Sequence, residues 1–179
     1  GNSWGSFQLG VFSLIRVESS PAPSGWQALW NSGLAYRSDG WSDYTARNRY
    51  EANFFAPTKP KLRLQLLGSF TDVFIGNTTT GSFTFTSSPT RLTFGGANGT
   101  TSNDLLTHTT DEFLATVLDF SQPVLLSVYS YNNFIGSVPV NANIASGYNI
   151  GNSADSLAPP SSPTINTGSV ALLRVDQND

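Results

Sequence analysis

The side chains best suited to bind a ligand gather near the N-terminus of this chain. All four tryptophans lie within the first 41 residues, at Trp4, Trp26, Trp30 and Trp41. Flat aromatic rings stack on the apolar faces of sugars, and nearby Asp, Asn and Arg side chains can hydrogen-bond to sugar hydroxyls. We therefore predict a carbohydrate-binding surface between residues 26 and 47, made by Trp26, Trp30, Asp39, Trp41, Asp43, Tyr44 and Arg47.

The competing explanation for these tryptophans is that a large apolar side chain is usually buried. It applies more strongly to Trp26 and Trp30 than to Trp41, whose sequence neighbours are all small or polar.

Few residues could carry out catalysis. The single histidine, His108, has no nucleophile motif beside it, and the chain contains no nucleophile elbow, no phosphate-binding loop and no pair of histidines at metal-ligand spacing. We therefore expect His108 to lie in a surface loop and expect no catalytic residue. A small glycoside hydrolase or esterase that uses Asp39, Asp43 or Glu51 remains an alternative, since glycoside hydrolysis needs two carboxylates on opposite sides of one bond.

The sequence also contains no clear motif for a metal or cofactor site. The chain has no cysteine, so it can form neither a disulfide nor a thiolate zinc site. Asp39, Asp43 and Asp104 could supply oxygen ligands to calcium, but no spaced Asp-x-Asp loop is present. We expect no metal and no cofactor.

Composition narrows the classes of partner. Only 12% of the 179 residues are charged, and the net charge of −3 has the wrong sign for a domain that binds phosphate groups. We expect no nucleic-acid partner, and no membrane span because no apolar run approaches the length of about 18 residues that a span needs. A start at Gly1 without methionine suggests a processed, secreted product, and Asn77 and Asn98 head possible glycosylation sequons.

Strand patterns occur along almost the whole chain. Residues 61–66 alternate polar and apolar side chains, which places Leu62, Leu64 and Leu66 on one buried face. The uninterrupted apolar run at 124–126 predicts a central strand that is covered on both faces. Further strands are expected at 7–17, 72–75, 82–86, 91–94, 113–118, 124–131, 134–140 and 170–175.

Short turns rich in Gly, Asn and Pro separate these strands, and only residues 25–35 and 101–113 could hold a helical turn or two. The pattern predicts an all-β fold, an antiparallel β-sandwich or jelly roll, as one domain over residues 1–179. The proline-rich segment 158–164 is expected to be a loop before a closing strand that pairs near the first strand.

Three stretches carry a family resemblance. They read Leu-Arg-Leu-Gln-Leu-Leu-Gly at 62–68, Arg-Leu-Thr-Phe-Gly-Gly at 91–96 and Pro-Val-Leu-Leu-Ser-Val-Tyr at 123–129. Over residues 49–151 their order resembles the β-sandwich accessory domain of some secreted GDSL-type (SGNH) lipolytic enzymes. The chain lacks that family's Gly-Asp-Ser nucleophile block and leaves no room for a catalytic domain after Gly151. The resemblance therefore implies a non-catalytic sandwich able to bind carbohydrate.

Two hypotheses from different classes follow. The first is a secreted, lectin-like β-sandwich that binds glycans or cell-surface carbohydrate through the residue 26–47 surface. The second is a structural or attachment module, such as a viral projection domain, a fibre tip or a subunit of an extracellular filament, for which a homo-oligomer is expected.

Overall fold

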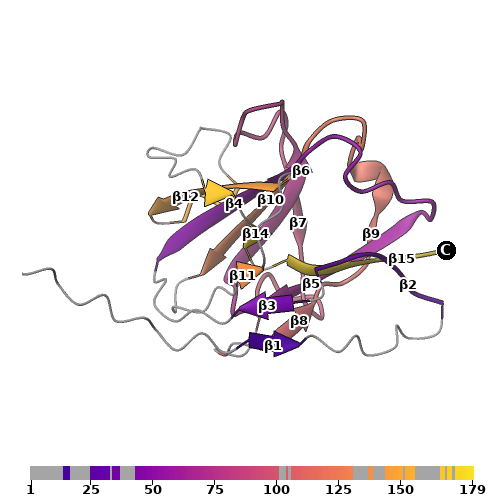
Figure 1. Ribbon diagram of the computed structural model, residues 1–179, viewed down its shortest axis with the longest axis horizontal. Coiled ribbons are helices and arrows are strands. Elements are labelled where there is room, and N and C mark those ends of the chain that lie inside the picture. The colour runs from indigo at the N-terminus through magenta and orange to yellow at the C-terminus, as the bar shows by residue number, and fades with distance from the viewer. Residues whose placement is uncertain are drawn as a thin grey trace, which may run out of the picture.

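The computed structural model describes residues 14–16, 25–32, 34–36, 43–100, 104, 106–130, 137–138, 144–150, 152–155, 166–167, 169–170 and 172–179. Two antiparallel sheets pack against each other as a β-sandwich, which confirms the predicted fold class (Figure 1). The single helical element in the described part of the chain is a 3-10 turn, η1 (Ala115–Val117). None of the described helical segments is long and apolar enough to cross a membrane.

The two main sheets contain six and five strands. The larger follows the order β13 (Asn166–Thr167), β12 (Ile144–Ile150), β4 (Tyr44–Tyr50), β10 (Val124–Ser130), β6 (Asp72–Asn77) and β7 (Thr90–Leu92). The smaller follows β2 (Gln27–Asn31), β15 (Leu172–Asn178), β5 (Lys61–Leu67) and β8 (Thr107–Thr109), with β9 (Phe113–Leu114) also paired to β5.

A third, smaller sheet joins segments that are distant in the sequence. Its order is β1 (Leu14–Arg16), β3 (Leu34–Tyr36), β11 (Ser137–Val138) and β14 (Ser169–Val170). In Figure 1 β1 and β3 lie below β5 and β15, away from β12 and β4.

The main core fills the space between the two large sheets. Leu62, Leu64 and Leu66 of β5 are at most 2% exposed and lie in it, as their alternation predicted. From the opposite sheet β10 contributes Val124, Leu126 and Val128. Period-2 alternation therefore sends one face of each strand into a shared apolar layer.

A second apolar cluster covers the outer face of the six-stranded sheet. It contains Phe74, Phe83, Phe85, Leu125, Tyr129 and Ala154. Strand β10 is paired on both edges, with β4 and β6, and all seven of its residues are buried. The prediction of a central strand covered on both faces is confirmed.

The cover over this outer face is a loop, although the sequence predicted a strand at 82–86. Backbone groups of the loop bond locally, from Ser82 N to Thr79 O and from Thr86 N to Asn77 O, so they do not form a strand ladder. Phe83 and Phe85 alternate because both side chains pack onto the sheet. A Cβ atom at Gly76 would lie 2.9 Å from the Phe85 ring, so the loop needs glycine there.

Other sequence predictions need correction. Residues 27–31 and 34–36 form strands where a helical turn was allowed, because β2 pairs with β15 and β3 pairs with β1. Residues 107–109 are likewise strand β8. The predicted strand at 113–118 is a two-residue strand followed by η1. The closing strand, β15, lies between β2 and β5 rather than beside the first strand.

Several predictions fall partly or wholly outside the described residues. Of the strand expected at 7–17, only β1 is described, and of the strand expected at 134–140, only β11. The proline-rich segment 158–164 lies wholly outside them.

Candidate functional site

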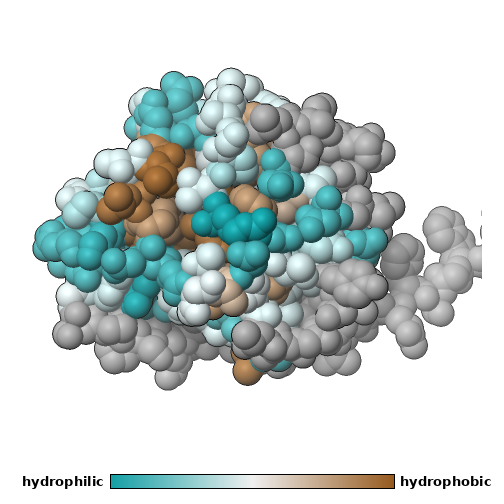
Figure 2. Space-filling view, turned by 180° about the vertical axis from the view of Figure 1, so that it is seen from behind, coloured by the Kyte–Doolittle hydropathy of each residue, from teal (hydrophilic) through white to brown (hydrophobic). Residues whose placement is uncertain are grey.

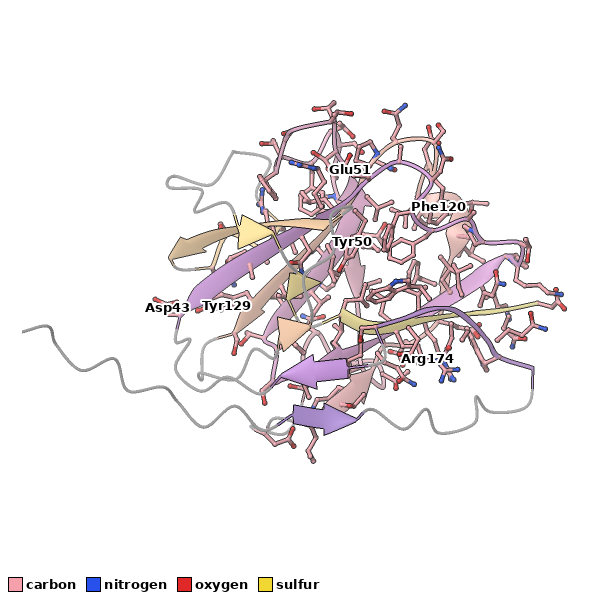
Figure 3. The ribbon with its side chains drawn as sticks, in the orientation of Figure 1. Asp43, Tyr50, Glu51, Phe120, Tyr129 and Arg174 are labelled. Carbon is pink, nitrogen blue, oxygen red and sulfur yellow. The ribbon has the colours of Figure 1, made fainter. Side chains whose placement is uncertain are left out.

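The predicted carbohydrate-binding residues are divided between the two large sheets. Trp26 and Trp30 lie at and within β2 of the five-stranded sheet, whereas Asp43, Tyr44 and Arg47 lie at and within β4 of the six-stranded sheet. In Figure 3 Asp43 lies at the left end of β4, while β2 begins on the right of Figure 1. Asp39, Trp41 and the Tyr44 side chain are outside the part of the chain that is described. The structure therefore does not gather these described residues into one surface.

Trp30 packs against the core, as the competing explanation for the tryptophans proposed. It is half-buried, and its ring centroid lies 5.9 Å from that of Phe54 and 6.0 Å from that of Phe55. These contacts join β2 to the main core. The ring is therefore part of the packing that holds β2 in place.

Trp26 stands apart from this aromatic group. It is half-buried just before β2, and the guanidinium carbon of Arg63 lies 4.2 Å from its ring centroid. This distance is that of a cation–π contact. Trp26 is thus held against the five-stranded sheet by a charged side chain.

Arg47 is buried, with only 2% of the residue exposed. Its two terminal nitrogens donate to the carbonyl oxygens of Phe83 and Ser153, each at 2.7 Å, and its guanidinium carbon lies 5.2 Å from the Phe85 ring centroid. Burial lowers the pKa of Arg47, and nearby Asp155 partly opposes this effect. Arg47 thus fastens two covering loops to β4 from beneath the surface.

Asp43 has an unusual backbone conformation and a partly exposed carboxylate. Its φ is 60°, in the left-handed region that residues other than glycine seldom adopt. The Tyr129 hydroxyl donates to Asp43 Oδ1 at 2.7 Å. One oxygen is therefore fixed by the fold, while Oδ2 makes no hydrogen bond with the described residues.

Further polar side chains surround Tyr129 at this end of the six-stranded sheet. Tyr129 is the cross-strand partner of Asp72, so both side chains lie on the outer face. Asp72 accepts hydrogen bonds from Arg91 and, at 2.8 Å, from Asn152, and the Arg91 guanidinium carbon lies 4.4 Å from the Phe74 ring centroid. We call Asp43, Asp72, Arg91, Tyr129 and Asn152 the loop-end surface.

Sequence reasoning found only Asp43 among these five residues. The sequence predicted Tyr129 within a buried strand, Asp72 at the start of a strand and Asn152 in a turn. The bond between Tyr129 and Asp43 spans 86 residues, so no local pattern contains it.

Of the carboxylates considered for hydrolysis, Asp43 and Glu51 lie far apart, and Asp39 lies outside the described residues. Asp43 precedes β4 and Glu51 follows it, at opposite ends in Figure 3. Eight extended residues separate their Cα atoms by about 26 Å, whereas glycosidase carboxylates lie about 5–10 Å apart. Arg49 Nε also lies 3.1 Å from Glu51 Oε1. Asp43 and Glu51 therefore cannot act on one bond.

His108 lies on edge strand β8 and not in a loop, which corrects the prediction for its position. It is half-buried, and its Nε2 lies 2.8 Å from Asp104 Oδ1. Within the described ranges no serine hydroxyl bonds to this ring, and no group of three or more acidic or histidine residues is placed to hold a metal ion.

One cavity lies between the sheets and does not fit a ligand. Aromatic and aliphatic side chains line it, among them Tyr50, Phe55, Phe113 and Phe120, and its volume is about 10 Å³ (Figure 3). Ligand pockets are typically about 300–1,000 Å³, whereas this space is close to that of one water molecule. This cavity therefore has no room for a ligand.

Comparison with known proteins does not identify a relative. No protein-family model matches the chain, and no curated protein matches it significantly.

Proposed function

We propose that this protein is a secreted, non-catalytic β-sandwich that binds glycans at the loop-end surface. The carboxylate of Asp43 carries the proposal. Its Oδ1 accepts a hydrogen bond from the Tyr129 hydroxyl, and its Oδ2 makes no hydrogen bond with the described residues. Asp39 and Trp41 precede Asp43 within four residues, so the predicted aromatic segment leads directly into this surface.

The geometry around Asp43 suits a hydroxyl-rich ligand. A carboxylate oxygen that is already oriented accepts a hydrogen bond without a further loss of side-chain freedom. The left-handed φ of Asp43 costs free energy, and such conformations tend to occur at binding sites. Asp43 therefore supplies a preorganised acceptor for sugar hydroxyls.

The neighbouring residues add hydrogen-bonding groups. Asn152 is exposed, and its amide donates one N–H to Asp72 and accepts from Ala154 N, which leaves the second N–H for a ligand. Arg91 is bonded to Asp72, which balances one charge at the surface. Trp41 would add the stacking ring on which sugar recognition depends.

Substitution at this surface tests the proposal. We expect Trp41→Ala to abolish glycan binding and Asp43→Asn to weaken it about tenfold, because the amide oxygen can still accept from Tyr129 while the charge is lost. A glycan array followed by titration calorimetry measures both effects. Glu112→Gln is the matched control, since Glu112 is an exposed carboxylate paired with Lys61 on the other sheet. Unchanged binding by Trp41→Ala and Asp43→Asn, with unfolding temperatures equal to wild type, would remove the loop-end surface from the account.

A structural or attachment module is the second candidate. Leu114 and Val117, in β9 and η1, are 54% and 42% exposed, and Figure 2 shows hydrophobic side chains gathered on one face of the molecule. Exposed apolar groups favour contact with another protein surface. Size exclusion with light scattering distinguishes the two functions. A stable symmetric oligomer that Leu114→Ser with Val117→Ser dissociates would support attachment, and a monomer would contradict it.

A further inference from the structure

We propose a second binding site, in which Arg63 and Trp26 recognise the carboxylate of an acidic sugar. It lies on the five-stranded sheet and uses none of the residues of the loop-end surface. It extends glycan recognition to a different chemical class and rests on the proposed function only for the sugar part of the ligand.

The Arg63 side chain is largely buried, but its N–H donors make no hydrogen bond with the described residues. Only 15% of its side chain is exposed, and its Nε is buried without a hydrogen-bond acceptor among the described residues. Its terminal nitrogens also make no hydrogen bond to the described part of the chain, yet they are not enclosed as Nε is. A guanidinium carries five N–H donors, and enclosed donors are nearly always paired.

The nearest carboxylate, Asp176, is shared between two arginines and faces only Nε of Arg63. Asp176 Oδ1 accepts from Arg174 Nε at 2.5 Å, whereas Asp176 Oδ2 lies 3.6 Å from Arg63 Nε, beyond hydrogen-bond length. The side chain of Asp176 is fully buried, so it cannot swing outward to the open edge of Arg63. Arg63 Nε therefore pairs with Asp176 through charge, whereas the terminal nitrogens of Arg63 have no acceptor among the described residues.

Trp26 fixes the orientation of this group. Its ring lies against the guanidinium, whose carbon is 4.2 Å from the ring centroid. The terminal nitrogens, which make no hydrogen bond to the described residues, are the edge that would meet the ligand. Two parallel N–H groups match the two oxygens of a carboxylate, and such bonds are stronger than those between neutral partners. The half-buried indole beside them offers apolar surface to a sugar ring.

Lys61 adds positive potential on the same side of the sheet. It lies two residues before Arg63 on β5, so both side chains share the face opposite the core leucines. The Lys61 side chain is 37% exposed, and its Nζ lies 3.2 Å from Glu112 Oε1. The acceptor that fits this arrangement is a single planar anion at Arg63.

An NMR titration with glucuronate, glucose and acetate tests the inference. We expect glucuronate to shift the Arg63 Nε–H and Trp26 indole signals, glucose to leave both unchanged, and acetate to shift Arg63 alone and bind more weakly. Acetate binding as tightly as glucuronate would overturn the acidic-sugar class. No shift of Arg63 by either anion would overturn the site itself.

Matched substitutions complete the test. Arg63→Lys keeps the charge beside Asp176 but loses the planar fork, and it should weaken glucuronate binding about tenfold. Arg49→Lys is the control, because Arg49 also lies over an aromatic ring but has Glu51 as a hydrogen-bonded partner. Equal binding by Arg63→Lys and wild type would contradict the inference. The amide signals of Asp43 and Tyr129 report on the loop-end surface in the same titration, so failure here and failure of that surface can be told apart.

Discussion

At the scale of single residues, charged side chains of this protein stabilise the fold mainly through hydrogen bonds with backbone groups. Asp111 shows this most clearly. Its carboxylate accepts from the Thr93 hydroxyl at 2.6 Å and from the amides of Gly95 and Gly96 at 2.9 and 2.7 Å. Both glycines have positive φ, which lets their N–H groups face the carboxylate. Asp111 thus closes a turn.

The first prediction concerns the pH dependence of stability. Hydrogen bonds from Thr93, then from the Gly96 and Gly95 amides, lower the pKa of Asp111 below its ordinary value of 3.8. A lowered pKa in the folded state stabilises the protein above the unfolded-state pKa, and this stabilisation is lost as the pH falls through the folded-state pKa. Asp111→Asn should therefore reduce stability at neutral pH and flatten its loss in acid.

Urea unfolding across that pH range measures this effect. Glu112→Gln is the control because Glu112 makes only an exposed ion pair. Parallel pH profiles for Asp111→Asn and wild type would show that the turn does not depend on the charge.

The second prediction concerns Arg47. A lysine at this position cannot reach the carbonyl oxygens of both Phe83 and Ser153, so Arg47→Lys should lower the free energy of unfolding by about 1–3 kcal/mol. Arg91→Lys is the matched control, since the Arg91 side chain is 36% exposed and pairs with Asp72. Chemical denaturation of both variants checks the difference, and equal small losses would show that Arg47 does not fasten the loops.

At the scale of elements, the local sequence pattern predicts a strand correctly where burial alone decides which residue types occupy its two faces. The alternation at 61–66 and the apolar run at 124–126 gave β5 and β10 correctly because burial alone determined their residues. The alternation at Phe83 and Phe85 had a different cause, since a loop laid on a sheet also turns every second side chain inward. Sequence alone does not separate these cases, because the outer face they cover is assembled from distant strands.

The third prediction tests how this loop is seated. Gly76→Ala places a methyl group against the Phe85 ring and should cost about 1–3 kcal/mol by overpacking. Phe85→Leu removes the clash, so the double variant Gly76→Ala with Phe85→Leu should lose less than the sum of the single variants. Denaturant unfolding gives all three values. Additive losses would mean that the loop does not rest on Gly76.

At the scale of the whole molecule, the sandwich carries two separate polar surfaces. The predicted residues 26–47 form a continuous stretch of sequence, but the chain passes from one large sheet to the other within it. Trp26 therefore joins Arg63, and Asp43 joins Tyr129, partners that lie 37 and 86 residues away. Sequence supplied one member of each pair, and only the fold supplied the other.

The central claim is that glycans bind at the loop-end surface, and signal mapping tests it most directly. A neutral oligosaccharide selected by array would be titrated into isotope-labelled protein, and each backbone amide signal followed by NMR. We predict shifts concentrated at Asp43, Asp72, Tyr129 and Asn152 and in the segment that contains Trp41. Shifts confined to β9 and η1, or no shift at any concentration, would contradict the account.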